Sequence, residues 1–537
     1  MSYPARARYG QFDRAQTKGH GMACASFISD SGPLTAPVLV GVLAVMSALA
    51  ACGVKKDGYH LVHMHRTALD DYIQQPDNSR EWTLEKETWQ KLADVPGARV
   101  RLYQISMISQ TWFAAMKYGV SEPVWRHRLM IYRPEVVRSE KALLFVGGGV
   151  RHPRDRASDK VACDVFDQVD FARIAATTGA IVVDLKDVPN QYLHFADGKP
   201  RKEDDLAAWA WYQYLSDPEA SATLLLQFPM VKSVVRAMDT VQAVLSYKGI
   251  TIERFVLAGA SKRGWTAWLA AAIDKRTDSL IPVVADILNS EEFVDHVYQT
   301  YRGPILALGD YYAPEHDVFS CLHTPEMHRS LMQMDPYCYR DRLNMPKYIV
   351  TASGDDVFPP DSAKLYVSAL PGPTWIRVLP NSRHYIFRTP DSLAQVTEIF
   401  ETFLGARVEN RTLPDVNWQR PEAGRLVARM PVCPKRAVLW QVTNPVARDF
   451  RMTTLARNGL QYQPENLLIR RGAPCQFSID IEPPGSGWTA WFVELAFDNA
   501  PYPDMVVTSS VGIIPDSYLE PSCTRDDNQA ENGEAKG

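Results

Sequence analysis

The sequence predicts an α/β fold, in which a doubly wound, mostly parallel sheet carries a lid-like insertion and is followed by a small C-terminal β-sandwich domain. Short apolar runs typical of buried strands alternate with helix-like segments from about residue 140 to 405. After residue 404 the pattern changes to short β-like runs separated by turn residues. Polar residues capable of chemistry follow several of the predicted strands, and such sheets place their sites at the carboxyl ends of strands.

Length and composition limit the class of protein. A chain of 537 residues is too long for one typical core, so we expect at least two domains. The net charge of −4 gives no reason to expect a nucleic-acid partner. The eight cysteines include no Cys-x-x-Cys pair and no Cys/His cluster at zinc spacing. We therefore expect no metal site and no cofactor.

Residues 1–52 resemble an export signal or a lipoprotein leader. A basic region precedes an uncharged apolar stretch, 33–51, and then Cys52. The run Leu49-Ala50-Ala51-Cys52 resembles a bacterial lipobox, in which the Cys is lipidated after cleavage. Asp30 and the distance of the basic residues from the apolar stretch are unusual, so a simple cleaved signal or a retained anchor stays open.

We accordingly expect an exported protein that is periplasmic or attached to the envelope. Attachment to a membrane would run through lipidated Cys52 or through the 33–51 segment. In an oxidising compartment disulfides become possible. The cysteines available for them are Cys163, Cys321, Cys338, Cys433, Cys475 and Cys523, and their spacing does not say which would pair.

The predicted α/β domain spans residues 58–405, and residues 58–96 are mixed and helical in places. The predicted strands are 98–113 and 124–132, as an antiparallel pair, and then the buried runs 142–146, 180–184, 255–258, 280–285, 347–352 and 375–379. The predicted helices are 164–178, 231–245, 265–273, 362–369 and 393–404. Residues 187–230 interrupt the alternation with four prolines and several aromatic residues. They are either a lid over a site or a structural excursion with a small core of its own.

The most informative stretch is Gly259-Ala260-Ser261-Lys262-Arg263-Gly264. It lies between a buried strand and an Ala-rich helix, which is the context of a nucleophile elbow. The second glycine comes one position later than in the strict Gly-x-Ser-x-Gly pattern. Ser261 is therefore either a nucleophile or simply the cap of the helix.

An acid and a histidine follow Ser261 in the order of a Ser-Asp-His hydrolase of this fold. Asp355 comes just after the strand at 347–352, and His384 lies in the loop after the last predicted strand. Asp356, next to the first candidate, and Asp286, after the strand at 280–285, are alternative acids. We expect Asp355 to hold the tautomer of His384, which in turn takes the proton of Ser261.

The oxyanion donors are expected from two segments. One is the backbone N–H of Lys262, and the other comes from Gly148 or Gly149, in the glycine run that ends a buried strand. That run has the alternative interpretation of a flexible turn. The side chains of Lys262 and Arg263 either add positive charge to this site or are exposed cations, and we favour exposed cations.

Several stretches resemble the PhoPQ-activated pathogenicity-related proteins, which are bacterial members of the α/β-hydrolase superfamily. They are Asp-Val-Pro-Asn-Gln at 187–191, Phe-Pro-Met-Val-Lys at 228–232, the elbow at 259–265, the segment 335–343, Ser-Gly-Asp at 353–355, Pro-Asn-Ser-Arg-His at 380–384 and the segment 439–451. The resemblance covers about residues 60–515. It implies an exported α/β-hydrolase-like protein of the PhoPQ-regulated group, linked in some bacteria to virulence or to resistance to host peptides. It implies no substrate.

The elbow is also similar to that of glucuronoyl esterases, which share Gly-x-Ser-basic-x-Gly, and this favours ester substrates. Our leading hypothesis is a serine hydrolase that acts on small-molecule esters or on peptides. The alternative is a non-catalytic envelope binding protein on a hydrolase scaffold.

The C-terminal region, 408–515, is predicted to be β-sandwich-like, and 516–537 to be a disordered tail. Its β-like runs are 426–429, 437–442, 450–455, 475–481, 490–496 and 505–511. This module binds a carbohydrate or an envelope partner, or it only packs on the first domain, which we favour. His296, His316, His323 and His328 show no metal spacing and are expected mostly at the surface or around a site.

Overall fold

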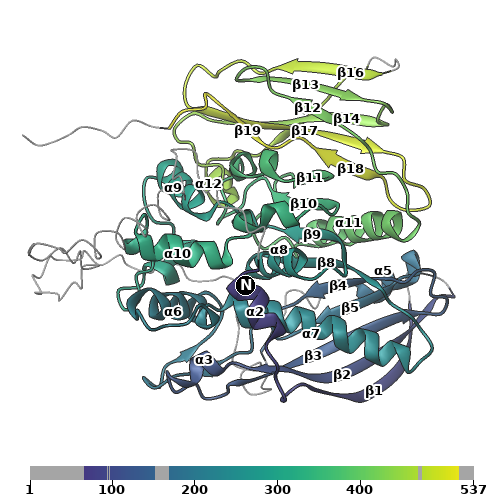
Figure 1. Ribbon diagram of the computed structural model, residues 1–537. Coiled ribbons are helices and arrows are strands. Elements are labelled where there is room, and N and C mark those ends of the chain that lie inside the picture. The colour runs from purple at the N-terminus through teal and green to yellow at the C-terminus, as the bar shows by residue number, and fades with distance from the viewer. Residues whose placement is uncertain (1–65, 93–94, 96, 151–168, 470–473, 519–537) are drawn as a thin grey trace, which may run out of the picture. The chain divides into compact units, whose positions relative to one another are not determined.

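The computed structural model describes residues 66–92, 95, 97–150, 169–469 and 474–518 (Figure 1). The predicted leader, with Cys52 and the 33–51 segment, lies outside these residues, as do Cys163, Cys523 and most of the predicted tail. Within the described part of the chain, no helix combines the length and the apolar character needed to cross a membrane.

One mixed sheet of fourteen strands runs through the protein. In spatial order its strands are β1 (Glu81–Lys91), β2 (Arg99–Thr111), β3 (Val124–Pro134), β5 (Ile181–Leu185), β4 (Lys141–Val146), β8 (Arg254–Ala260), β9 (Thr277–Val283), β10 (Lys347–Ala352), β11 (Thr374–Leu379), β18 (Met505–Thr508), β17 (Trp488–Phe497), β14 (Arg436–Asn444) and β15 (Gln463–Asn466), with β19 (Gly512–Ile514) beside β17. The strands from β5 to β11 are parallel. The predicted parallel core, and the antiparallel pair β2–β3 before it, are confirmed.

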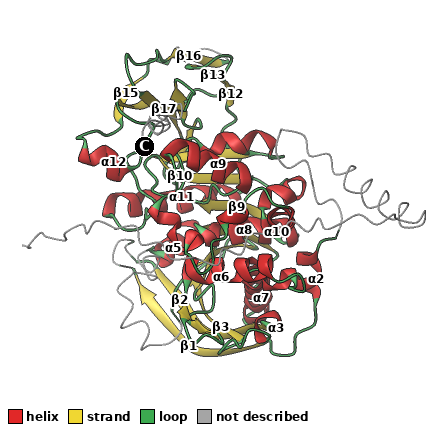
Figure 2. Cartoon of the chain, turned by 90° about the vertical axis from the view of Figure 1, so that its left-hand side faces the viewer, coloured by secondary structure: helices red, strands yellow, loops and turns green. Residues whose placement is uncertain are grey.

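Helices cover both faces of the parallel strands (Figures 1 and 2). The helices α7 (Gln227–Ser246) and α8 (Lys262–Ile273) pack with the core that contains Leu144 of β4. The helices α5 (Phe171–Thr178) and α11 (Pro390–Val408) pack with the core that contains Leu143 and Phe145. Successive side chains of a strand point to opposite faces, so this division confirms the predicted doubly wound sheet.

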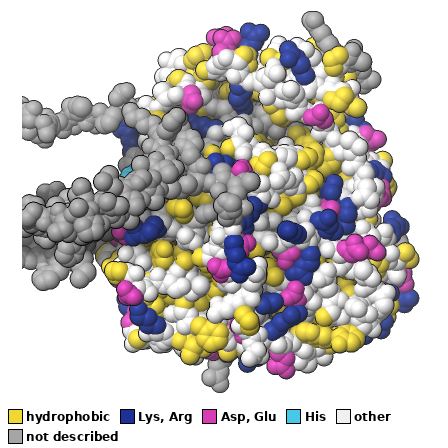
Figure 3. All heavy atoms as spheres, in the orientation of Figure 1, with side chains coloured by type: hydrophobic (Ala, Val, Ile, Leu, Met, Phe, Trp, Pro, Cys, Tyr) yellow, Lys and Arg dark blue, Asp and Glu magenta, His cyan; other side chains and the backbone are white. Residues whose placement is uncertain are grey.

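The remaining helices and strands surround this core. The short helices are α2 (Ala68–Gln74), α3 (Phe113–Met116) and α12 (Met452–Arg457). The chain between β5 and β8 contains the hairpin β6 (Leu193–His194) with β7 (Pro200–Arg201) and the helix α6 (Glu203–Ser216). The chain between β9 and β10 contains α9 (Ser290–Tyr301), α10 (Pro325–Met334) and the 3₁₀ segments η3 (Leu306–Tyr312), η4 (Phe319–Cys321) and η5 (Pro336–Arg342). On the face drawn in Figure 3, acidic and basic side chains are interspersed, so this face presents no field of a single sign.

Local structure differs from the expectation at three places. Residues 58–96, expected to be mixed and helical in places, contain the helix α2, but residues 81–91 form the edge strand β1. The side chains of β1 alternate between exposed and half-buried up to a bulge after Leu84. The run 450–455, predicted as a strand, is mostly the helix α12, since short apolar runs do not distinguish the two structures. Residues 362–369 form two 3₁₀ turns, η6 (Ser362–Leu365) and η7 (Val367–Ala369), instead of an α-helix.

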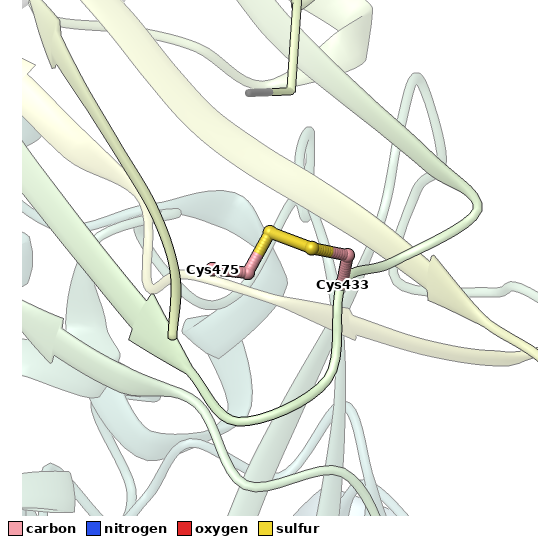
Figure 4. The surroundings of a disulfide bond; sticks show 2 residues. All are labelled: Cys433 and Cys475. Atoms are coloured by element: carbon pink, nitrogen blue, oxygen red, sulfur yellow. A yellow bond between two sulfur atoms is a disulfide. The ribbon is translucent and has the colours of Figure 1, made fainter. Parts of the chain in front are cut away.

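The C-terminal strands form a second layer and also extend the large sheet. A three-stranded sheet, β12 (Asn417–Gln419), β13 (Arg425–Met430) and β16 (Cys475–Asp480), shares an apolar core with β17. β18 meanwhile pairs with β11, at Thr508 and Ile376. A disulfide joins Cys433 to Cys475 (Figure 4), whereas Cys321 and Cys338 form none. The C-terminal β layers agree with the predicted fold, while the boundaries proposed for the domains stay predictions.

A buried charged cluster fixes the C-terminal region to the rest of the protein. The Arg448 guanidinium donates to Asp361 Oδ2 (2.6 Å), and His296 Nε2 lies 2.9 Å from Asp361 Oδ1. Tyr518, in the predicted tail, lies with its hydroxyl 2.8 Å from His296 Nδ1. The first residues of the tail therefore pack on the protein. His296 is buried, as is His316, so neither lies at the surface.

Candidate active site

Ser261 occupies a tight turn between β8 and α8. Its φ of 54° and ψ of −128° are uncommon for a residue with a side chain and cost about 1–3 kcal/mol of strain. Its hydroxyl makes no capping hydrogen bond with the helix. Ser261 thus stands at the N-cap position of α8 without capping the helix through its side chain, and the strained turn has the geometry of a nucleophile elbow.

Close packing explains both glycines of the elbow. A Cβ atom on Gly259 would lie 2.5 Å from the carbonyl oxygen of Arg263, and one on Gly264 would lie 2.5 Å from Cβ of Ala285. The first glycine thus lets helix α8 start directly over the end of β8. The second lets α8 contact the chain after β9, which is why it stands at position 264.

The structure brings the predicted serine, histidine and first-choice acid together. His384 Nε2 lies 3.0 Å from Ser261 Oγ, and His384 Nδ1 lies 3.0 Å from each oxygen of Asp355. The backbone N–H groups of Val357 and Phe358 donate to Asp355 Oδ1 at 2.7 and 3.1 Å, which fixes the carboxylate. Because a carboxylate accepts hydrogen bonds, Nδ1 carries the proton and Nε2 is left to accept from the serine hydroxyl.

The electrostatics of His384 follow from this arrangement. Burial lowers the pKa of its imidazole, but the charge of Asp355 and the hydrogen bond to it outweigh burial and raise the pKa above its ordinary value of 6.5. The carboxylate of Asp355 thus stabilises the protonated form of the imidazole.

The two alternative acids have other partners. Asp286 accepts a 2.5 Å hydrogen bond from the Tyr366 hydroxyl, and among the described residues no hydrogen bond joins it to His384. Burial raises the pKa of Asp286 to about 7. Asp356 accepts from Arg383 Nε (2.9 Å) and from Thr453 Oγ1 (3.0 Å). The geometry therefore favours Asp355.

The expectation that Lys262 and Arg263 are exposed cations is wrong. Their exposed fractions are 8% and 5%, and both pair with Glu203 at the start of α6. Sequence reasoning missed Glu203, although the run Glu203-Asp204-Asp205 inside the insertion was a signal of a charged feature.

The predicted oxyanion donors lie at the same edge of the sheet. Lys262 begins α8, where backbone N–H groups have no acceptor within the helix. β4 pairs in parallel with β8, Val146 opposite Gly259, so Gly148 leaves the sheet beside the elbow. The carbonyl oxygens of Gly148 and Gly149 accept from the Asp187 N–H (2.8 Å) and from Gln191 Nε2 (2.9 Å). The glycines do not line the cavity beside Ser261, and their role stays a prediction.

A cavity of about 550 Å³ has Ser261 and His384 in its wall. The insertion contributes part of the lining through Tyr192 and α6, and it also packs on itself, with Phe195 against Trp209. The insertion thus lines the cavity, as expected of a lid, and also has packing of its own, as expected of a structural excursion. The rest of the lining comes mainly from α9, η3, η4 and α10, in a part of the chain for which the sequence predicted no helix or strand. In the described residues, no cluster of three or more His, Cys, Asp or Glu side chains is arranged to hold a metal ion.

Known proteins similar to this chain share its sequence or its architecture. The sequence profile of the family described as PhoPQ-activated pathogenicity-related protein matches residues 69–451. Autocrine proliferation repressor protein A of Dictyostelium discoideum is 30% identical over 486 residues, which are 85% of this chain and 92% of that protein.

Two solved structures are similar to this chain at a lower sequence identity. Acetyl xylan esterase 1 from Thermoanaerobacterium sp. JW/SL YS485 has a TM-score of 0.41 and 14% identity, over 65% of this chain and 96% of that one. A glucuronoyl esterase from Solibacter usitatus has a TM-score of 0.35 and 12% identity, over 61% and 86%. At these scores neither structure decides anything about this chain.

The contact between His384 and Asp355 predicts how the imidazole titrates. In the wild type, His384 should titrate above 6.5; in Asp355→Asn its pKa should fall, because the strongest of the charges that oppose burial is removed and only the smaller contributions of Asp204 and Asp356 remain. NMR of protein labelled at histidine Cε1 measures both values, and His384→Gln identifies the resonance. An unchanged titration in Asp355→Asn would contradict the assigned contact.

Proposed function

The chain belongs to the PhoPQ-activated pathogenicity-related protein family, and we propose that it is a serine hydrolase of ester or peptide bonds with Ser261, His384 and Asp355 as its triad. The single observation that carries this proposal is the continuous hydrogen-bonded row from Asp355 through His384 to Ser261. The strained backbone of Ser261 at the start of α8 adds support, since strained residues cluster at functional sites, and a serine with a purely structural role would not require this conformation.

The mechanism follows from the positions of these groups. His384 Nε2 takes the proton of the Ser261 hydroxyl while Oγ attacks the carbonyl carbon of the substrate. Asp355 holds the ring and stabilises its positive charge. The Lys262 N–H, with one from Gly148 or Gly149, binds the oxyanion. His384 then gives the proton to the leaving group, and water releases the acyl group from Ser261 by the same steps.

The cavity favours substrates with a bulky apolar group. The Phe358 ring lies 5.7 Å from the His384 ring, and the Phe293 ring lies 5.2 Å from that of Phe358, so an aromatic wall begins at the histidine. Trp211 and Tyr311, from α6 and η3, add further aromatic surface. A cavity of about 550 Å³ with such walls is far larger than an acetyl group requires.

Export is part of the proposal. The Cys433–Cys475 disulfide supports it, because such bonds persist in oxidising compartments and are rare in the cytosol. Attachment through Cys52 or the 33–51 segment remains a prediction.

A non-catalytic role is the second candidate function. The relative from Dictyostelium discoideum is named a repressor of proliferation, and that name describes no hydrolase. On this alternative, the cavity beside Ser261 would bind a ligand without cleaving it. Measurable turnover that depends on Ser261 separates the two candidates.

The triad predicts a specific pattern of losses in the hydrolysis of p-nitrophenyl esters. Ser261→Ala, His384→Ala and Asp355→Asn should each lower kcat/KM about 10⁴-fold, because each removes one member of a cooperating set. Asp286→Asn and Asp356→Asn are the matched controls and should stay within about tenfold of the wild type, because their partners lie elsewhere. A larger loss in Asp286→Asn than in Asp355→Asn would move the acid to Asp286.

The cavity predicts a preference for larger acyl groups. The kcat/KM for p-nitrophenyl hexanoate should exceed that for the acetate by about tenfold or more, since each buried methylene adds binding free energy. Val294→Trp, which fills the cavity from α9, should abolish this preference while the acetate is still cleaved. Gln299→Trp adds the same bulk on an exposed site of α9 and should retain the preference. Equal rates for both esters in the wild type would show that the cavity does not receive the acyl group.

A further inference from the structure

We propose that Glu203 and Gln191 of the insertion are positioning residues that hold the elbow and the loop after β4 together, so that both oxyanion donors face one point. This inference rests on the proposed hydrolase function. It concerns two residues that belong neither to the triad nor to the oxyanion donors. The pair is called the Gln191–Glu203 bridge below.

One end of the bridge holds the elbow. Arg263 donates from Nη1 and Nη2 to the two oxygens of Glu203, at 2.7 and 2.6 Å, and Lys262 Nζ donates to Oε2 at 2.8 Å. These are the two residues directly after Ser261. A fork of two parallel hydrogen bonds fixes direction as well as distance, so Glu203 sets where the first turn of α8 lies.

The other end of the bridge holds the loop after β4. Gln191 Nε2 donates to Glu203 Oε1 (2.8 Å) and to the carbonyl oxygen of Gly149 (2.9 Å). Gln191 Oε1 accepts from the backbone N–H of Glu203 (2.9 Å). Arg263 Nε also donates to the carbonyl oxygen of Val188 (2.7 Å). The insertion therefore contacts both segments that supply oxyanion donors.

The charges of the bridge make it rigid. Burial would raise the pKa of the Glu203 carboxyl, but Arg263 and Lys262 outweigh burial and hold the pKa well below its ordinary value. Glu203 thus stays ionised at working pH. It also has a φ of 49°, a strained conformation that persists only where surrounding contacts impose it. Without Glu203, the buried Arg263 would lose this ion pair and Lys262 would be left with Asp204, at 2.8 Å.

The position of the bridge explains why it should affect chemistry more than binding. The predicted donors, the Lys262 N–H and one from Gly148 or Gly149, come from chain segments that no turn connects. A displacement of about 1 Å between such groups costs about 10²-fold in rate. The oxyanion forms only in the transition state, so its loss lowers kcat and leaves KM nearly unchanged.

The test compares two ion-paired carboxylates in the full protein. Glu203→Gln keeps the size of the side chain and removes its charge. The control is Glu494→Gln in β17, because Glu494 also pairs with two cations, Arg377 (2.6 Å) and Arg436 (2.8 Å), and its side chain is even less exposed, 4% against 21% for Glu203. With p-nitrophenyl acetate, Glu203→Gln should lower kcat about 10–100-fold and change KM less than about threefold. Glu494→Gln should lose thermal stability and retain kcat.

A second variant covers the case in which Glu203→Gln does not fold. Gln191→Met keeps the side-chain length and the Glu203–Arg263 ion pair but breaks the contact with Gly149. It should lower kcat about tenfold with KM retained. Wild-type kcat in Gln191→Met or in folded Glu203→Gln would overturn the positioning role. Absence of turnover in the wild type would instead overturn the proposed function itself.

Discussion

The site depends above all on the hydrogen bonds between Asp355 and His384. They fix the ring so that its second nitrogen meets Ser261, a residue 123 positions away in the sequence. Only the parallel sheet makes this possible, since it brings the carboxyl ends of β8, β10 and β11 to one edge. Close packing at Gly259 and Gly264 surrounds the strained turn at Ser261 and holds it in place.

Much of this arrangement could be predicted from the sequence. Buried parallel strands are continuous apolar runs, and β4, β5, β8, β10 and β11 were found within a few residues of their bounds. The order of Ser261, Asp355 and His384 then follows from the fold, because each lies in a loop after such a strand. The sequence could not exclude Asp286, whose position after β9 is equivalent. The hydrogen bonds of His384 with Asp355, and that of Tyr366 with Asp286, separate the two acids.

What the sequence could not show depends on contacts between distant segments. Lys262 and Arg263 are buried because Glu203, about sixty residues earlier, compensates their charge, and no local pattern predicts such a pair. In the cavity wall, α9 has buried residues at helical spacing, Phe293, Val294 and Val297, which the sequence analysis missed, whereas the 3₁₀ segment η3 is too short to show a period. Similarly, the alternation in edge strand β1 is weak, because neither of its faces is fully buried and a bulge after Leu84 shifts its register. Local propensity was informative where burial was complete and uninformative where it was partial.

Activation of the Ser261 hydroxyl by His384 and Asp355 can be measured by reaction of the folded protein with a fluorophosphonate, followed by digestion and mass spectrometry. This reagent reports an activated serine whatever the natural substrate is. We expect one equivalent of label, on the peptide that contains Ser261, and no label in His384→Ala. Folded wild-type protein that takes up no label, or takes it up at another residue, would show that Ser261 is not activated by this pair.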